Sequence, residues 1–280
     1  MLKSIHYISI VVALLLSVLL FWKGNIIPPP KPAEAAMAQM PDNNAPPAAA
    51  DFDSLLSATK KKLSPQAQAM VRDLESAATS NDKTAAAKAF EDLGKLWQQN
   101  KFRNIAAHYF AESGKLDNSE KKLNFAAHLY AEELEDEKNP ELRQWLAESA
   151  IDCYTRSLAI NPDNDTMRLD LASVYINGTG QTMQGIQELL TIVKNDPANL
   201  PANMVLGTMA IESGQYDKAI QRGELILKYH KDNWQARLFM AEAYKELGKK
   251  DKAIDLLNEA KQIKQDPQFS ADVDNYIKTF

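Results

Sequence analysis

The sequence predicts an all-α protein: a solenoid of stacked helix hairpins that follows an N-terminal transmembrane helix. Three observations indicate this fold. Small residues return to the same phase about every 34 positions after residue 87, the chain of 280 residues has only 10 glycines, and an uninterrupted apolar run stands near its start. A sheet-rich or loop-rich fold would need more turn residues than this composition supplies.

The apolar run covers residues 5–22, which is 18 residues without an Asp, Glu, Lys or Arg. As a helix it would span ~27 Å, close to the hydrocarbon thickness of a bilayer. We therefore expect residues 1–23 to form a single-pass anchor. The alternatives are a cleaved signal peptide and a buried soluble helix. Small residues suited to cleavage occur only at 33–38, beyond Pro28 to Pro30, which is long spacing for a signal peptide.

Residues 24–50 contain seven prolines and few large apolar side chains. Such a segment cannot bury enough surface to offset the entropy of ordering it, so we expect an extended linker. Residues 51–86 are expected to form helices that precede the repeats.

The repeat consists of a small residue on one helix followed by a second small residue on the next. The first small residues are separated by 33, 45, 35 and 34 positions; they are Gly94, Ala127, Ala172, Gly207 and Ala241. The second ones are Ala106, Ala150, Gly185, Ala219 and Ala253. Small residues let the backbones of two helices approach closely, so each pair predicts a helix hairpin, and hairpins that cannot bury both faces stack into an array.

These residues resemble the tetratricopeptide repeat family, most clearly over 205–232 and 239–263. The family pattern is an apolar residue, a small residue, an aromatic residue, Gly, then an aromatic residue with Ala three positions later. The second stretch carries its first aromatic residue as Tyr244, and the first stretch carries its second one as Tyr216, followed by Ala219. The resemblance covers residues 87–267 as five units and implies a right-handed α-solenoid. Gly223 departs from the pattern, because an aromatic residue is usual there. Residues 268–280 are expected to form a capping helix with Phe269, Val273, Tyr276 and Ile277 on one face.

The second unit is 11 residues longer than the others, which is close to three helical turns. Both of its helices can therefore lengthen while keeping their inward faces in phase. Asn139 is predicted to cap the second helix and Pro140 to occupy its first turn. The acidic residues at 132–137 are either a solvated helix end or a docking point for a basic partner.

No catalytic or metal-binding constellation is present in the sequence, so we expect no enzyme activity, metal or cofactor. The four histidines form no metal-ligand spacing, and Cys153 is expected to be a small core residue. Residues 178–180 are interpreted as a turn between helices, since no strand precedes them. After position 50 there are 29 basic and 35 acidic residues, a net charge of −6, which argues against nucleic-acid binding.

The family resemblance implies that the first helix of each unit lines a groove that binds protein or peptide segments. Carried over position by position, the lining comprises Glu91, Lys95, Gln98, Asn124, His128, Leu169, Ser173, Asn177, Met204, Thr208, Ile211, Leu238, Glu242 and Lys245. Only Lys95 and Asn124 have the residue types of a carboxylate clamp, and their order differs from that of the clamp. We therefore expect a groove for neutral or partly apolar segments.

The resulting hypothesis is a non-catalytic scaffold anchored in a bacterial inner membrane, with its repeats in the periplasm. Proteins of similar layout assist envelope assembly, secretion or cytochrome maturation. The alternatives are an organellar import receptor with its repeats in the cytosol, an enzyme with its site in the groove, and a purely structural spacer. The sequence does not identify the partner, the pathway, the topology or the oligomeric state.

Overall fold

The computed structural model describes residues 48–280, and these contain helices and no strand. Helix bounds are α2 Phe52–Lys60, α3 Pro65–Ala78, α4 Lys83–Gln99, α5 Arg103–Asp117, α6 Glu120–Asp136, α7 Pro140–Ile160, α8 Asp165–Ser173, the π-helical segment η1 Val174–Gly178, α9 Thr182–Asn195, α10 Leu200–Glu212, α11 Tyr216–Tyr229, α12 Trp234–Glu246, α13 Lys250–Lys264 and α14 Pro267–Ile277. The expected all-α class is confirmed for this part of the chain.

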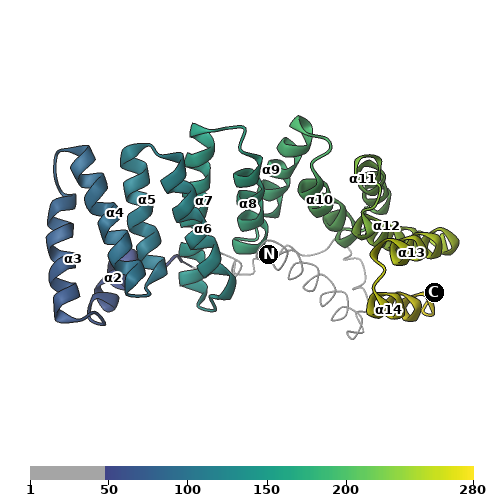
Figure 1. The fold of residues 1–280 in the computed structure, drawn as a ribbon, viewed down its shortest axis with the longest axis horizontal. Helices are drawn as coiled ribbons and strands as arrows, with labels where there is room; N and C mark the ends of the chain where they lie inside the picture. The colour runs from purple at the N-terminus through teal and green to yellow at the C-terminus, as the bar shows by residue number, and fades with distance from the viewer. Residues whose placement is uncertain (1–47) are drawn as a thin grey trace, which may run out of the picture. The chain divides into compact units, whose positions relative to one another are not determined.

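Five antiparallel hairpins follow one another along the chain (Figure 1). They are α4–α5, α6–α7, α8–α9, α10–α11 and α12–α13, and η1 continues α8 within the third. The second helix of each hairpin packs against the first helix of the next, so the contacts run between neighbours in sequence. This is the arrangement of a helical solenoid.

All ten small residues of the repeat are buried, as the periodicity predicts. The seven alanines among them are 0–1% exposed. At Gly185 a Cβ would lie 2.8 Å from the carbonyl oxygen of Ala172, so these two helices do approach to backbone contact. The expected pairing of small residues is therefore confirmed in the third hairpin.

At Gly94 and Gly207 the glycine makes room for an aromatic ring, which the sequence interpretation did not anticipate. A Cβ on Gly94 would lie 2.8 Å from the ring of Phe110, and one on Gly207 would lie 2.9 Å from the ring of Phe239. The first ring comes from the second helix of the same hairpin, and the other comes from the next hairpin.

Gly223 explains why the source of the ring differs. Phe110 follows Ala106 by four positions, and Gly223 follows Ala219 by four, so Gly223 stands where the first hairpin has its phenylalanine. Without a side chain at 223, Phe239 reaches Gly207, and Met240 occupies the space directly against Gly223. Met240 is only 5% exposed there. The departure from the repeat pattern is thus compensated by residues of the next helix.

The long second hairpin packs against both of its neighbours. Asn139 caps α7 by accepting a hydrogen bond from the Leu142 N–H at 2.9 Å, and Pro140 is the first residue of the helix, as predicted. Glu132 and Glu133 both form ion pairs with Arg103 of α5. The acidic end of α6 is therefore partly neutralised within the chain.

Arg143 joins the tip of this hairpin to the third one. Its guanidinium donates to the carbonyl oxygens of Leu134 and Asn177, each at 2.8 Å. Gly178 also packs here, since a Cβ on it would lie 2.9 Å from Leu134. Gly178 was expected to form a turn, but it belongs to η1, and the residue with positive φ is Gly180 at 69°.

The start of the chain differs in detail from the predicted division. Helix α4 begins at Lys83, four residues before the expected first unit, because Asp82 caps it by accepting from the Thr84 N–H at 2.9 Å. The predicted anchor at 5–22 lies outside the described residues, as does all but the end of the predicted linker. Within residues 48–280 no helix has the length and apolar character needed to cross a bilayer.

Helix α14 closes the C-terminal end of the array. Phe269 and Val273 are buried, and Tyr276 and Ile277 pack against the same core cluster as Leu257 of α13. The four residues thus share one inward face, as the sequence pattern predicts.

Candidate functional site

The candidate site is the first-helix face, defined as the accessible side chains of α4, α6, α8 with η1, α10 and α12. None of the predicted lining residues is buried, and Lys95, Gln98, Ser173 and Asn177 are exposed. The others are half-buried. That these side chains form one partner-binding groove stays a prediction.

On α4 and α6 the predicted polar residues other than the exposed Gln98 are already engaged within the chain. Lys95 pairs with Glu91, which also pairs with Lys122 at 3.0 Å. Hydrogen bonds from Lys95 and then Lys122 lower the pKa of Glu91 to about 2. Asn124 accepts from the hydroxyl of Ser157 in the core. These contacts leave this part of the face poor in free hydrogen-bonding groups.

His128 lies beside a carboxylate that sequence reasoning missed. Its Nδ1 is 3.2 Å from the Tyr154 hydroxyl and 3.8 Å from a carboxylate oxygen of Asp170 on α8. Burial raises the pKa of Asp170. The other hairpins carry Asp, Phe or Val at the position of Asp170, two residues before the first small residue, so the repeat gave no signal for it.

On α10 and at the start of α12 the predicted lining is mainly apolar. Met204, Thr208, Ile211 and Leu238 are half-buried, and Ile211 and Leu238 rest on the core clusters beneath them. The Thr208 hydroxyl and the Met204 sulfur form no side-chain hydrogen bond with any described residue. In this area, side chains packed on the core lie next to side chains that are not engaged in hydrogen bonds within the described residues.

Glu242 and Lys245 lie on α12 as expected, but helix α14 engages them. Tyr276 donates its hydroxyl to Glu242, and the Lys245 ammonium donates to the Tyr276 oxygen at 2.8 Å. The Lys245 nitrogen also stands 4.7 Å from the centre of the Tyr276 ring. Because α14 packs where a further repeat would continue, these two residues stabilise the end of the array.

Phe125 on α6 is an accessible aromatic residue that was not predicted. It is 43% exposed, and its ring meets that of Phe110 edge to face at a centroid distance of 5.0 Å. Its equivalent in the fifth hairpin is Phe239, which lies against Gly207. Phe110 fills that space in the first hairpin, so Phe125 stays outside.

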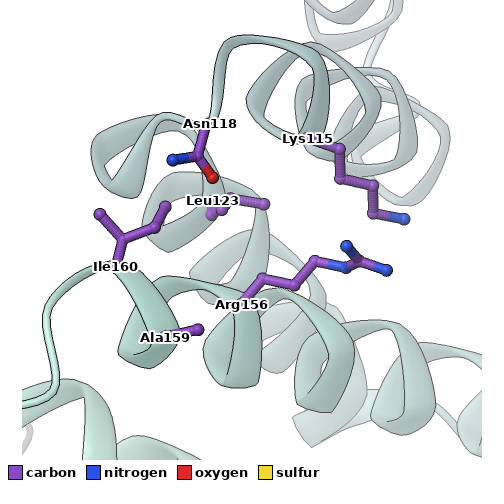
Figure 2. A pocket seen from close by; sticks show the side chains of 6 residues that line it. All are labelled: Lys115, Asn118, Leu123, Arg156, Ala159 and Ile160. Atoms are coloured by element: carbon purple, nitrogen blue, oxygen red, sulfur yellow. The ribbon is translucent and has the colours of Figure 1, made fainter.

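A pocket of about 240 Å³ lies between the ends of α5, α6 and α7 (Figure 2). Its lining is Lys115, Asn118, Leu123, Arg156, Ala159 and Ile160. Both cations are already paired: Lys115 contacts Glu112 at 2.9 Å and Asp152 at 3.0 Å, and Arg156 contacts Asp152 at 2.7 Å. The charges of Lys115 and Arg156 are therefore already balanced by carboxylates, so the pocket has no free pair of cations to bind an anion.

The described residues contain no group of three or more His, Cys, Asp or Glu side chains placed to hold a metal ion. Cys153 is 1% exposed, and burial raises its pKa to about 12. Its thiol therefore stays protonated at neutral pH and is a poor nucleophile. This agrees with the expectation of a core residue.

Comparisons with known proteins agree with the repeat. Residues 210–271 match a family model described as tetratricopeptide repeat. No curated protein matches the chain in sequence.

Among solved structures, MamA is 17% identical with a TM-score of 0.51, covering 64% of this chain and 92% of MamA. Another MamA structure is 18% identical with a TM-score of 0.50, covering 62% and 95%. YrrB, described as a TPR protein with an unusual peptide-binding site, is 16% identical with a TM-score of 0.51, covering 75% and 99%. At these identities the likeness concerns the fold.

Proposed function

We propose that this chain, which matches a tetratricopeptide repeat model over residues 210–271, is a non-catalytic scaffold that binds other proteins. The observation that carries the proposal is the apolar area of α10 and α12. Met204, Ile211 and Leu238 are half-buried on neighbouring first helices, with Thr208 among them. An apolar segment that covers this surface breaks few hydrogen bonds. It also removes apolar area of both partners from water, which favours binding.

The partner is a neutral or partly apolar protein segment that lies along the first-helix face. Met204 has a flexible, polarisable side chain that adapts to several shapes. The polar side chains on α4 and α6 pair mainly with one another or with other residues of the chain. In this proposal they form the polar edge of the binding surface. The peptide-binding site named for YrrB, a protein of similar fold, supports this kind of partner.

The proposal is tested by crosslinking in the native membrane from a photoreactive residue at Thr208. We expect Met204→Glu and Leu238→Glu to reduce the yield of crosslinked partner at least tenfold, because a carboxylate would be buried against apolar groups. Met183→Glu is the matched control, since Met183 is 64% exposed on α9 and lies outside the first-helix face. Equal yields from all three variants would refute the assignment of this face.

We further propose that residues 5–22 anchor the chain in a bacterial inner membrane and that the repeats face the periplasm. The apolar run and the proline-rich segment after it support this arrangement. In that compartment the scaffold would serve envelope assembly, secretion or cytochrome maturation. Protease added after permeabilising the outer membrane alone should digest the repeats. If digestion requires opening of the inner membrane, the periplasmic assignment is wrong.

A further inference from the structure

Helix α2 docks on the second helices of two different hairpins. The Phe52 ring stacks on His108 of α5 at a centroid distance of 3.6 Å, with an angle of 24° between the planes. It also stacks on Trp145 of α7 at 5.8 Å and 18°. Tyr109 meets the same ring edge to face at 6.2 Å. Phe52 is thus the central contact between α2 and the repeats.

The other contacts of α2 are few, and the polar ones lie near its two ends. The Ala50 N–H donates to the Glu141 carbonyl oxygen at 2.9 Å just before the helix. Lys60 pairs with Glu75 of α3 at 2.7 Å at its end. Leu55 and Leu56 are only half-buried against the core. A helix of nine residues does not persist alone in water, so its docking depends on these contacts.

This docking covers one face of the His108 imidazole and leaves the residue half-buried. No described residue forms a hydrogen bond or an ion pair with its ring. The charged groups that face it are Asp53 on α2 and Glu112 and Lys115 on α5, and Lys115 is itself paired with Asp152 of α7. Burial outweighs the two acidic neighbours and lowers the pKa of His108 from 6.5 to about 4.

We propose that α2 is an acid-released latch: at neutral pH it covers His108 and Trp145, and proton uptake by His108 frees α2 from α5 and α7. The physical reason is that docking removes water from an imidazolium that forms no hydrogen bond or ion pair with a described residue, and Asp53 and Glu112 offset that loss only in part. Undocking of α2 returns the ring to water and leaves the aromatic faces of Phe52 and Trp145 accessible. We expect the hairpins to remain folded, because they pack mainly against one another and not against α2.

The direction of the pH dependence follows from the lowered pKa. The docked state binds the proton less well than the undocked state, so docking is strongest above 6.5 and weakens as the pH falls toward 4. If undocking restores the ordinary value, the docking equilibrium changes by roughly 300-fold in total, of which roughly 70-fold falls between pH 7.5 and pH 4.5.

The test uses the full-length chain with spin labels at two exposed positions, Ser57→Cys on α2 and Glu148→Cys on α7, in a Cys153→Ala background. Distances between the labels are measured at about pH 7.5 and about pH 4.5, either side of the ordinary histidine pKa. We expect one short distance at the higher pH and a broad, longer distribution at the lower. Circular dichroism at both values should show that the hairpins remain helical.

His108→Phe keeps a flat ring in the stack but has no nitrogen to titrate, so α2 should stay docked at both pH values. The matched control is His128→Phe, which removes a half-exposed histidine from α6 and should still show acid release. A third measurement does not depend on these variants: Phe52→Ala uncovers His108, and its pKa measured by NMR should rise toward 6.5.

The proposal is overturned if the label distance stays short at the lower pH. It is equally overturned if the His108→Phe variant releases α2 as readily as the unmodified chain. A pKa of His108 that stays near 4 in the Phe52→Ala variant would show that α2 is not what covers the ring.

Discussion

Replacement of Gly223 by alanine tests the compensation between the fourth and fifth hairpins. A Cβ at this position would overlap the Met240 side chain and lie 3.1 Å from the ring of Phe239. Overpacking of this kind costs about 1–3 kcal/mol, whereas Gly→Ala inside a helix returns about 1 kcal/mol. We therefore expect Gly223→Ala to lower the free energy of unfolding by up to about 2 kcal/mol.

Met240→Ala supplies the second half of the test. Alone, it should cost about 2–5 kcal/mol, because a buried methionine leaves a cavity. In the Met240→Ala background the overlap with Met240 is absent and only the 3.1 Å contact with Phe239 remains, so Gly223→Ala should stabilise the chain by up to about 1 kcal/mol. The effect of Gly223→Ala on the free energy of unfolding thus changes sign between the two backgrounds, which corresponds to a coupling energy of about 1–3 kcal/mol between the two positions.

The assay is urea unfolding followed by circular dichroism, with native-state hydrogen exchange in α11 and α12 to locate the change. Local exchange is needed because a repeat array can open one unit at a time. Gly185→Ala is the control: its Cβ meets the backbone oxygen of Ala172, so Met240→Ala should not rescue it. Additive effects of Gly223→Ala and Met240→Ala would refute the proposed compensation.

Three further predictions rest on single contacts. Arg143→Ala should speed hydrogen exchange in η1 and at the end of α6 by a factor corresponding to about 1–3 kcal/mol, since two carbonyl oxygens lose their donor; unchanged exchange in η1 would contradict this. Tyr276→Phe should lower the stability of α14 against local opening by about 1 kcal/mol, because Glu242 and Lys245 lose the hydroxyl that both contact. This is measured as faster hydrogen exchange over residues 267–277. An equally large increase in α4 would show that the effect is not local to α14. Glu91→Gln should reduce the loss of folding stability that occurs as the pH falls from 4.5 toward 2. The reason is that a carboxyl group with a lowered pKa stabilises the fold only while it is ionised. Acid unfolding curves that superimpose on those of the parent chain would contradict this prediction.

Short-range features of the sequence determined much of this molecule. The return of small residues every 34 positions predicted the hairpins, because close helix contact tolerates little else at those points. Asn139 and Pro140 likewise marked the start of α7, since capping depends on residues within one turn. The inward face of α14 followed from helical periodicity alone.

Only the tertiary structure decided which distant groups meet. The sequence could not show that Phe239 fills the space over Gly207, because that depends on a missing side chain at 223 in another helix. Nor could it place Asp170 beside His128, pair Glu132 with Arg103, or dock Phe52 on His108. The repeat fixes how each helix packs on its neighbours, whereas contacts between residues 29 to 56 positions apart depend on how the hairpins are placed in space.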